Sequence, residues 1–281
     1  MTSVVDLDAY FKRIGYAGDR APRLQTLHAI TRAHAQTIAF ENIDILLGLR
    51  ISLEPQAIFN KLVAHQRGGY CFEQNGLLLQ VLCQLGFRAR ALGARVRLRV
   101  TDRAVLPRRT HMLIEVMLDD ARWLTDVGIG AASLTQALRL VPRLEQQTPH
   151  DRRRMLHDGR LWFQQLWRDG GWTDIYQFTL DDFPLVDRDV ANWYTSTNPA
   201  VSFSNALMGA LALPDGGRTT LLDGTLTQLH SDGHARHQPL QTPTQLEWAL
   251  AQLGIALAPD ELDRLMCRLE LREPARRHNG H

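Results

Sequence analysis

The sequence predicts an α+β protein with three parts: an N-terminal helical bundle, a central antiparallel β-barrel and a C-terminal α/β lid. Up to about residue 85 the apolar residues recur at helical spacing, and from Phe87 they alternate with a period of two. The alternating runs are short and separated by tight-turn signals, which is typical of an antiparallel sheet that can close on itself. We therefore expect domains over residues 1–86, 87–190 and 191–281.

The first domain should be built from helices. Two are predicted over residues 6–14 and 22–36, and a third over about residues 55–65, opened by a proline. Between these segments, Glu41 follows a phenylalanine, and Arg67 precedes a pair of glycines. We expect these two residues to form an ion pair that anchors the loop after the third helix.

A cysteine opens the next helix. In the stretch 67–76, two glycines precede Cys71, and apolar residues follow at helical spacing until Gly86, which suits the position after a helix end. The free N–H groups and the dipole at a helix start favour a thiolate, the reactive form of cysteine. Gly68 and Gly69 allow backbone torsions closed to other residues and let a ligand approach closely. Cys71 is a candidate nucleophile, although a small buried cysteine that only packs fits the same pattern.

A β-hairpin supplies the partners that a cysteine nucleophile needs. Residues 111–118 and 121–127 are strand-like and are joined by two aspartates as the turn. With a two-residue loop, Asp126 becomes a diagonal neighbour of His111 on the same face of the hairpin. An imidazole can take the proton of the thiol, and a carboxylate can fix the tautomer of that imidazole. The hairpin therefore offers Cys71 a His–Asp pair.

The remaining barrel strands alternate in the same way. All the strands are expected at about residues 87–100, 111–118, 121–127, 152–157, 160–166 and 172–178. The first of them should have one wetted basic face, made by Arg95, Arg97 and Arg99. These arginines, or Arg108 and Arg109, could instead attract the phosphates of a coenzyme. The run 152–154, which is all arginine, is expected to be solvated.

The C-terminal part mixes helices and strands. The expected elements are a helix at about residues 184–194, strands near 205–213, 218–223 and 225–230, and helices over 242–254 and from 259. Val186, Val190 and Trp193 share one side of the first of these helices. The polar residues 272–281 are expected to fray.

Composition excludes several classes of protein. The chain has 281 residues, of which 44% are hydrophobic and 22% charged, and its formal charge is +2. This balance does not favour nucleic acid as the main partner. The N-terminus lacks a signal-peptide pattern, and no apolar run approaches the ~18 residues of a membrane span. We therefore expect a cytoplasmic protein without a membrane partner.

No metal site is expected. The three cysteines form no CxxC pair, which argues against structural zinc and fits a reducing compartment. His230, His234 and His237 straddle an Asp-Gly turn, which predicts a solvated hairpin rather than a zinc site.

Several motifs together resemble the arylamine N-acetyltransferases. They are Phe40-Glu41-Asn42, Arg67-Gly68-Gly69-Tyr70-Cys71, Thr110-His111, Asp126-Val127-Gly128-Ile129-Gly130, Ala191-Asn192-Trp193-Tyr194 and Ser202-Phe203. Their order and spacing agree over most of the chain. The resemblance implies the catalytic core that this family shares with cysteine proteases and transglutaminases, with Cys71, His111 and Asp126 as the catalytic triad.

The resemblance also implies a reaction and its ligands. Acetyl would pass from acetyl-CoA to an aromatic amine or hydrazine, or to the oxygen of an N-hydroxyarylamine, through an acetyl-cysteine. Phe40, Ile129 and Phe203 are candidates for an apolar slot that takes the aromatic ring, although each could simply pack the core. Ile129 stands where the family usually has an aromatic residue, which bears on the shape of this slot. The loop formed by Gly128, Ile129 and Gly130 is expected to bring backbone N–H groups near the acyl group or the pyrophosphate of acetyl-CoA.

Two other interpretations of the same residues stay open. A hydrolase or a transglutaminase-like acyltransferase could use a Cys–His–Asp geometry on peptides, with water or lysine as the acceptor. A non-enzymatic binding module could keep the three residues as a structural relic. In a relic, Cys71 would have no reason to react with iodoacetamide faster than Cys83 or Cys267 at neutral pH.

Overall fold

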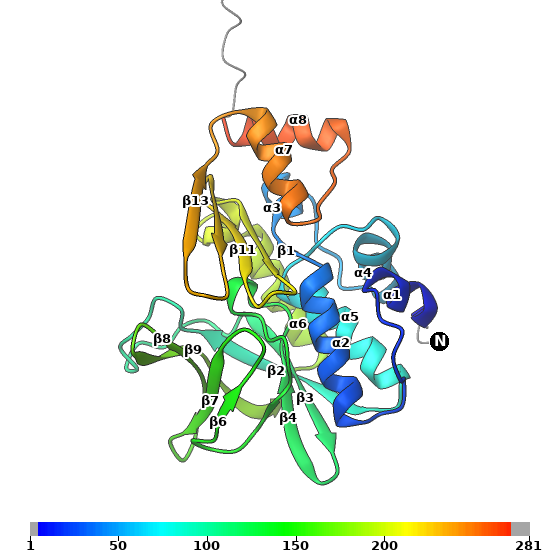
Figure 1. Cartoon of the computed structure of the whole chain (residues 1–281), viewed down its shortest axis with the longest axis vertical. Coiled ribbons are helices and arrows are strands. Elements are labelled where there is room, and N and C mark those ends of the chain that lie inside the picture. The colour runs from blue at the N-terminus through cyan, green and yellow to red at the C-terminus, as the bar shows by residue number, and fades with distance from the viewer. Residues whose placement is uncertain (1–4, 271–281) are drawn as a thin grey trace, which may run out of the picture.

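The computed structural model describes residues 5–270, and the predicted polar tail over residues 272–281 lies outside them (Figure 1). The helices are α1 (Leu7–Arg13), α2 (Leu24–Thr37), α3 (Ile43–Leu46), α4 (Pro55–Phe59), α5 (Cys71–Gln84), α6 (Leu185–Thr197), α7 (Pro243–Gln252) and α8 (Pro259–Arg268). Shorter turns are π-helical at Asn60–Ala64 and 3-10 at Gly130–Ala132 and Ser202–Ser204. Among the described helices, none has the length and apolar character needed to cross a membrane.

The predicted helices of the first part are confirmed. α5 is central: Leu77, Leu78, Val81 and Leu82 are fully buried, and they pack against α2 and the outer face of the barrel. The helix ends where predicted, because Gly86 has φ +88°, a conformation that glycine adopts without strain. Asn60–Ala64 continues α4, so the predicted helix over residues 55–65 is present with a π-helical second half.

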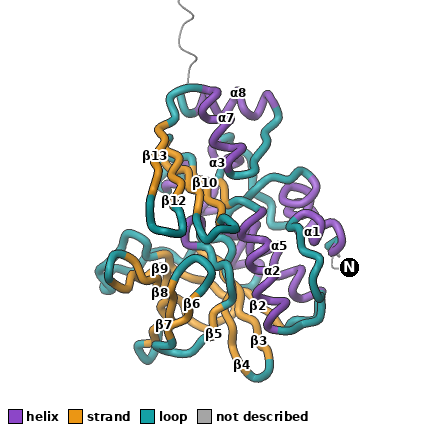
Figure 2. The backbone as a smooth tube through the Cα atoms, in the orientation of Figure 1, coloured by secondary structure: helices purple, strands orange, loops and turns teal. Residues whose placement is uncertain are grey.

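The central part is an antiparallel sheet in the order β5-β4-β3-β2-β9-β8-β7-β6 (Figure 2). Its strands are β2 (Arg88–Val96), β3 (His111–Leu118), β4 (Ala121–Thr125), β5 (Leu138–Arg139), β6 (Glu145–Gln147), β7 (Arg152–His157), β8 (Trp162–Arg168) and β9 (Gly171–Asp182). The edge strands β5 and β6 meet through the side chain of Gln146, which bonds both the N–H and the carbonyl of Arg139. The sheet is therefore a nearly closed barrel, and the predicted fold class is confirmed.

The C-terminal part holds a second antiparallel sheet in the order β1-β10-β11-β12-β13. Its strands are β1 (Phe40–Glu41), β10 (Met208–Ala212), β11 (Arg218–Leu222), β12 (Thr225–Leu229) and β13 (Ala235–Pro239). α7 and α8 cover it, with a leucine-rich core between them (Figure 1). β1 comes from the N-terminal part and is an edge strand of this sheet, and Phe40 forms an isolated parallel bridge with Gly69. The sheet therefore adjoins the loop before the predicted nucleophile.

The solvent-exposed basic face predicted for the first barrel strand is wrong at Arg97, whereas Arg99 is exposed and Arg95 is half-buried. β2 ends at Val96, and Arg97, beyond it, is only 1% exposed. Its guanidinium donates to the side-chain oxygen of Gln177 at 2.6 Å and to the carbonyl of Val105 at 3.0 Å. The chain turns after β2, so alternation no longer decides which side chains meet water.

The solvated run predicted at residues 152–154 is wrong at its middle residue. Arg153 is 0% exposed, because alternate residues of β7 face the barrel interior. It forms an ion pair with Asp151 at 2.6 Å and donates to the carbonyl of Ala132 at 3.0 Å. A buried guanidinium is retained here because its donors have acceptors.

The apolar side of α6 stays exposed. Val186, Val190 and Trp193 share one side as predicted, and their exposed fractions are 70%, 65% and 66%. The buried residues of this helix are instead Ala191, Asn192 and Thr195. In α6, periodicity identified a helix, but the larger apolar side chains do not mark its packed face.

Candidate active site

Cys71 is the first residue of α5 and is buried. The carboxylate of Glu73 accepts the N–H of Tyr70 at 3.0 Å, which satisfies one backbone donor at this helix start. Neither Gly68 nor Gly69 adopts a left-handed conformation. Glycine is required before the helix for steric reasons, because a Cβ atom on Gly68 would lie 2.3 Å from the carbonyl oxygen of Ala39.

The loop after Asp126 packs directly on the cysteine. A Cβ atom on Gly128 would lie 2.6 Å from the Cα atom of Cys71, so only glycine allows this approach. Gly130 has φ +68° and faces the ring of Phe40. The two glycines of the predicted coenzyme loop therefore lie against the nucleophile and a residue of the predicted pocket.

The predicted hairpin brings His111 and Asp126 together. β3 and β4 pair with Ile114 opposite Thr125, which is the predicted register. β4 ends at Thr125, so Asp126 lies one residue beyond the paired strand and not inside it as predicted. The two turn aspartates have φ of 47° and 56°, the left-handed pair that a tight hairpin turn requires. His111 Nε2 lies 2.6 Å from Asp126 Oδ2, and both side chains are buried.

The surroundings of His111 decide its charge. Burial alone lowers its pKa, but the Asp126 carboxylate, and then Cys71, outweigh burial and raise the pKa to about 10. Because Nε2 is taken by Asp126, Nδ1 is the ring nitrogen left for the thiol. The arrangement can hold a proton on the imidazole at neutral pH beside a sulfur atom, which favours a thiolate nucleophile.

Asn75 is a supporting residue that the sequence analysis missed. Its side chain donates to Asp126 Oδ1 at 2.8 Å and to the carbonyl of Met112 at 2.7 Å, and it accepts the N–H of Val127 at 3.0 Å. It lies one helical turn after Cys71, on the same side of α5. The four-residue spacing between Cys71 and Asn75 could have identified this residue from the sequence, because a polar residue one helical turn from a nucleophile lies on the same side of the helix.

Two of the three predicted pocket residues, Phe40 and Phe203, lie in the same apolar cluster as the cysteine. The rings of Phe40 and Phe203 lie 6.1 Å apart, and Phe203 is 5.8 Å from the ring of Tyr70. Phe40, Phe203, Tyr70 and Cys71 belong to one apolar cluster. Ile129 packs into the barrel core instead, although the glycines on both sides of it contact the site.

Comparison with known proteins identifies the family. A family model described as N-acetyltransferase matches residues 23–261. The arylamine N-acetyltransferase of Escherichia coli (strain K12) is 38% identical to this chain over 255 residues, which cover 91% of this chain and 90% of that protein. The chain belongs to the arylamine N-acetyltransferase family.

Other arylamine N-acetyltransferases extend the match. The Salmonella typhimurium protein named arylamine N-acetyltransferase / N-hydroxyarylamine O-acetyltransferase is 38% identical over 232 residues, 83% of this chain and 82% of its own. The structure of the Mycobacterium marinum arylamine N-acetyltransferase in complex with CoA superposes with a TM-score of 0.89 at 34% identity, and covers 95% of this chain and 99% of that one. The resemblance read from the motifs is therefore confirmed.

A buried ion-pair network fixes the loop before the nucleophile. Arg67 pairs with Glu41 at 3.0 Å, as predicted, and also with Asp44 at 2.8 Å. It reaches Glu261 of α8 at 3.2 Å as well. The loop that delivers Cys71 is thus tied to the C-terminal part of the chain.

A second network fixes the loop after Asp126. Asp151 pairs with Arg153 and with Arg218, which donates to the carbonyl of Ser133 at 3.0 Å. Burial raises the pKa of Asp151, but the two arginines outweigh it and hold that pKa well below its usual range. Nothing in the sequence indicated these contacts, because Arg218 lies in another sheet. Over the described residues, no group of three or more His, Cys, Asp and Glu side chains is placed to hold a metal ion.

Proposed function

We propose that this protein transfers acetyl from acetyl-CoA to aromatic amines and hydrazines through an acetyl group carried on Cys71. The observation that carries the proposal is the buried contact between His111 and Asp126 beside a cysteine at a helix start. Membership of the arylamine N-acetyltransferase family supports the reaction, and the CoA complex of the Mycobacterium marinum protein supports the donor. The name of the Salmonella typhimurium relative supports O-acetylation of N-hydroxyarylamines as a further activity.

In the first half-reaction, the thiolate of Cys71 attacks the carbonyl carbon of acetyl-CoA. The N–H groups of Cys71 and Phe72, the first two residues of α5, can stabilise the oxyanion that forms. The bond from carbon to the coenzyme sulfur then breaks, and the imidazolium of His111 gives its proton to the departing thiolate. Acetyl-Cys71, free CoA and neutral His111 result.

In the second half-reaction, the amine nitrogen attacks acetyl-Cys71. Neutral His111 accepts the proton that the amine loses, and the bond from carbon to the Cys71 sulfur breaks. Asp126 holds the imidazole in one orientation throughout and stabilises its charged form. The enzyme returns to the thiolate–imidazolium state, so no proton is gained or lost over the cycle.

The acceptor site follows from the apolar cluster. Phe40 and Phe203 lie beside Cys71 and can pack on the two faces or the edge of an aromatic ring. Ile129 follows Gly128, whose backbone touches Cys71, and we keep it as a candidate that limits the length of the ring substituents. A ring held there would place its amine near the acetyl group.

Steady-state kinetics test the proposal against a peptide hydrolase or transglutaminase-like enzyme. With acetyl-CoA and aniline or hydrazine acceptors, double-reciprocal plots at several donor concentrations should be parallel, as a double displacement requires. Glutamine-containing peptides and acyl-peptides should support no turnover. Intersecting lines with arylamines, or faster turnover with peptides, would rule the proposal out.

The cysteines bear on the cellular compartment. Cys71, Cys83 and Cys267 are all free, which supports a reducing compartment, and we propose a cytoplasmic location. Fractionation of expressing cells should find the activity with a cytoplasmic marker rather than with membranes or secreted protein.

A further inference from the structure

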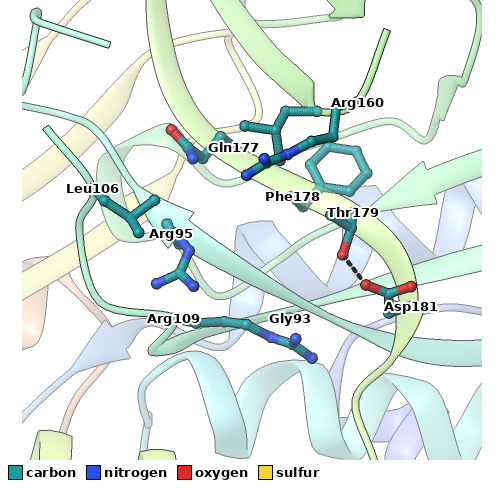
Figure 3. A pocket seen from close by; sticks show the side chains of 10 residues that line it. Gly93, Arg95, Leu106, Arg109, Arg160, Gln177, Phe178, Thr179 and Asp181 are labelled. Carbon is teal, nitrogen blue, oxygen red and sulfur yellow. Dashed lines mark hydrogen bonds between the residues drawn. The ribbon is translucent and has the colours of Figure 1, made fainter. Parts of the chain in front are cut away.

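A cavity of about 210 Å³ lies beside the strand end that carries His111 (Figure 3). Three arginines contribute to its lining: Arg95 on β2, Arg109 just before β3, and Arg160 between β7 and β8. Arg95 and Arg109 lie near each other, with Arg160 across the cavity from them in this view. None of the triad residues lines it, so it is separate from the cysteine site.

The fold makes room for Arg109 in this cavity. A Cβ atom on Gly93 would lie 2.3 Å from Arg109 Nε, so the guanidinium rests on the strand only because that residue is glycine. The guanidinium stacks on the ring of Phe183 at 4.8 Å and donates to the carbonyl of Asp182 at 3.3 Å. Its Nε is buried and has no hydrogen-bond partner within the described residues. The Arg109 guanidinium is therefore held in position by Phe183 and Asp182, while its Nε–H group has no acceptor among the described residues.

The positive charge in the cavity is not balanced. None of the three arginines forms an ion pair with a carboxylate of residues 5–270. Arg95 donates to the carbonyl of Pro107 at 2.7 Å, and burial, followed by the charge of Arg109, lowers its pKa. The one carboxylate in the lining, Asp181, accepts from the hydroxyl of Thr179 at 2.7 Å.

We propose that this cavity binds phosphate groups of the acetyl-CoA donor. Arginine forks match phosphate oxygens in charge and geometry, and a half-buried site strengthens such contacts. Arg109 also precedes Thr110, whose carbonyl lies 3.9 Å from the sulfur of Cys71, so the cavity and the nucleophile share one short segment. The flexible arm of the coenzyme would run from this cavity to the cysteine. The inference rests on the proposed function for the identity of the ligand.

Calorimetric binding of three ligands tests the assignment: CoA, 3′-dephospho-CoA and pantetheine, which has no phosphate. In Arg95→Gln and Arg160→Gln, the affinity for CoA should fall by about tenfold, the loss expected for one charged hydrogen-bonded contact. The affinity for pantetheine should not change, and Arg95→Lys should retain part of the affinity for CoA. Arg236→Gln is the matched control, since Arg236 on β13 is exposed and its side chain makes no hydrogen bond or ion pair with the described residues.

The comparison between ligands locates the contact. If the loss with 3′-dephospho-CoA equals the loss with CoA, the cavity holds the pyrophosphate; if the loss disappears, it holds the 3′-phosphate. The proposal is overturned if both glutamine variants bind CoA within twofold of the parent, if pantetheine loses affinity equally, or if the parent does not bind CoA. Failure of the proposed function would appear separately, as the absence of acetyl-Cys71 in a protein whose CoA affinity still depends on Arg95.

Discussion

Burial and charge compete most directly at His111. Burial lowers its pKa, whereas Asp126 and Cys71 raise it to about 10, above the ordinary value of 6.5. The stabilisation that protonated His111 confers is therefore fully present below about pH 6.5 and is lost as the pH rises through about 10. Nitrogen NMR of histidine-labelled protein should show both ring nitrogens of His111 protonated at pH 8. His111→Gln assigns the signal, and a neutral ring at pH 8 would contradict the expectation.

Replacement of Asp126 by asparagine should be far more damaging than its similar shape suggests. Oδ1 accepts from Asn75 at 2.8 Å and from the N–H of Gly128 at 2.9 Å, so the carbonyl oxygen of an asparagine would take that position. Its NH₂ would then face His111 and stabilise the wrong tautomer. In serine enzymes this change costs up to ~10⁴ in rate. Folded Asp126→Asn enzyme that keeps activity within a few-fold of the parent would refute this role.

Ile129 lies between the two glycines of the loop after Asp126. It is buried next to Gly128 and Gly130, which touch Cys71 and Phe40. Ile129→Phe should change the order of kcat/KM among para-substituted anilines, because a larger ring in the barrel core would shift the neighbouring glycines against the acceptor slot. Acetylation of Cys71 by acetyl-CoA should change little. An unchanged order would remove Ile129 from the pocket.

At the scale of elements, the network around Arg67 joins the loop before α5 to β1 and α8. Arg67→Met leaves Glu41, which is 1% exposed, and Asp44 without this partner. Breaking a buried ion pair from one side costs about 3–5 kcal/mol. Urea unfolding should show a loss of that order.

The matched control for Arg67 is Arg20, whose pair with Asp8 lies at the surface, with side chains 49% and 82% exposed. Arg20→Met should cost less than about 1 kcal/mol, because water screens such pairs. If both variants lose the same stability, the buried network does not hold the nucleophile loop as we infer.

Elements whose signals are local could be predicted from the sequence. α5, α7 and the β3–β4 hairpin begin and end near the expected residues, because their caps and turns are encoded within a few positions. β1, β5 and β6 were missed. Each has only two or three residues, which is too short for a period of two to be recognised. β1 in addition pairs with β10, which is distant in the sequence.

At the scale of the whole molecule, the catalytic residues could be predicted because their residue types and their positions in local elements both indicate a cysteine nucleophile with a His–Asp pair. His111 and Asp126 follow from hairpin pairing, and Cys71 from a helix start. Arg153 and Arg218 could not be predicted as supports of the loop after Asp126, because their shared partner Asp151 is reached only in the folded barrel. The division of the chain into domains at residues 86 and 190 stays a prediction.

The helical part supplies Cys71, the barrel supplies His111 and Asp126, and both networks tie these loops to the C-terminal part. In the first half-reaction, the thioester of acetyl-CoA is exchanged for a thioester on Cys71, and the free-energy change of this exchange is small. Without an amine the reaction therefore stops at acetyl-Cys71. The acetyl-enzyme should then accumulate. Its accumulation distinguishes a carrier cysteine from a packed one.

The most direct measurement is the intact mass of the protein after incubation with acetyl-CoA alone. We expect one added acetyl group on the peptide that contains Cys71, its removal when aniline or an arylhydrazine is added, and no adduct on Cys71→Ala. Turnover with amine while the parent never carries the label would mean that the amine attacks acetyl-CoA directly. Cys71 would then be a packing residue, and the mechanism proposed here would be wrong.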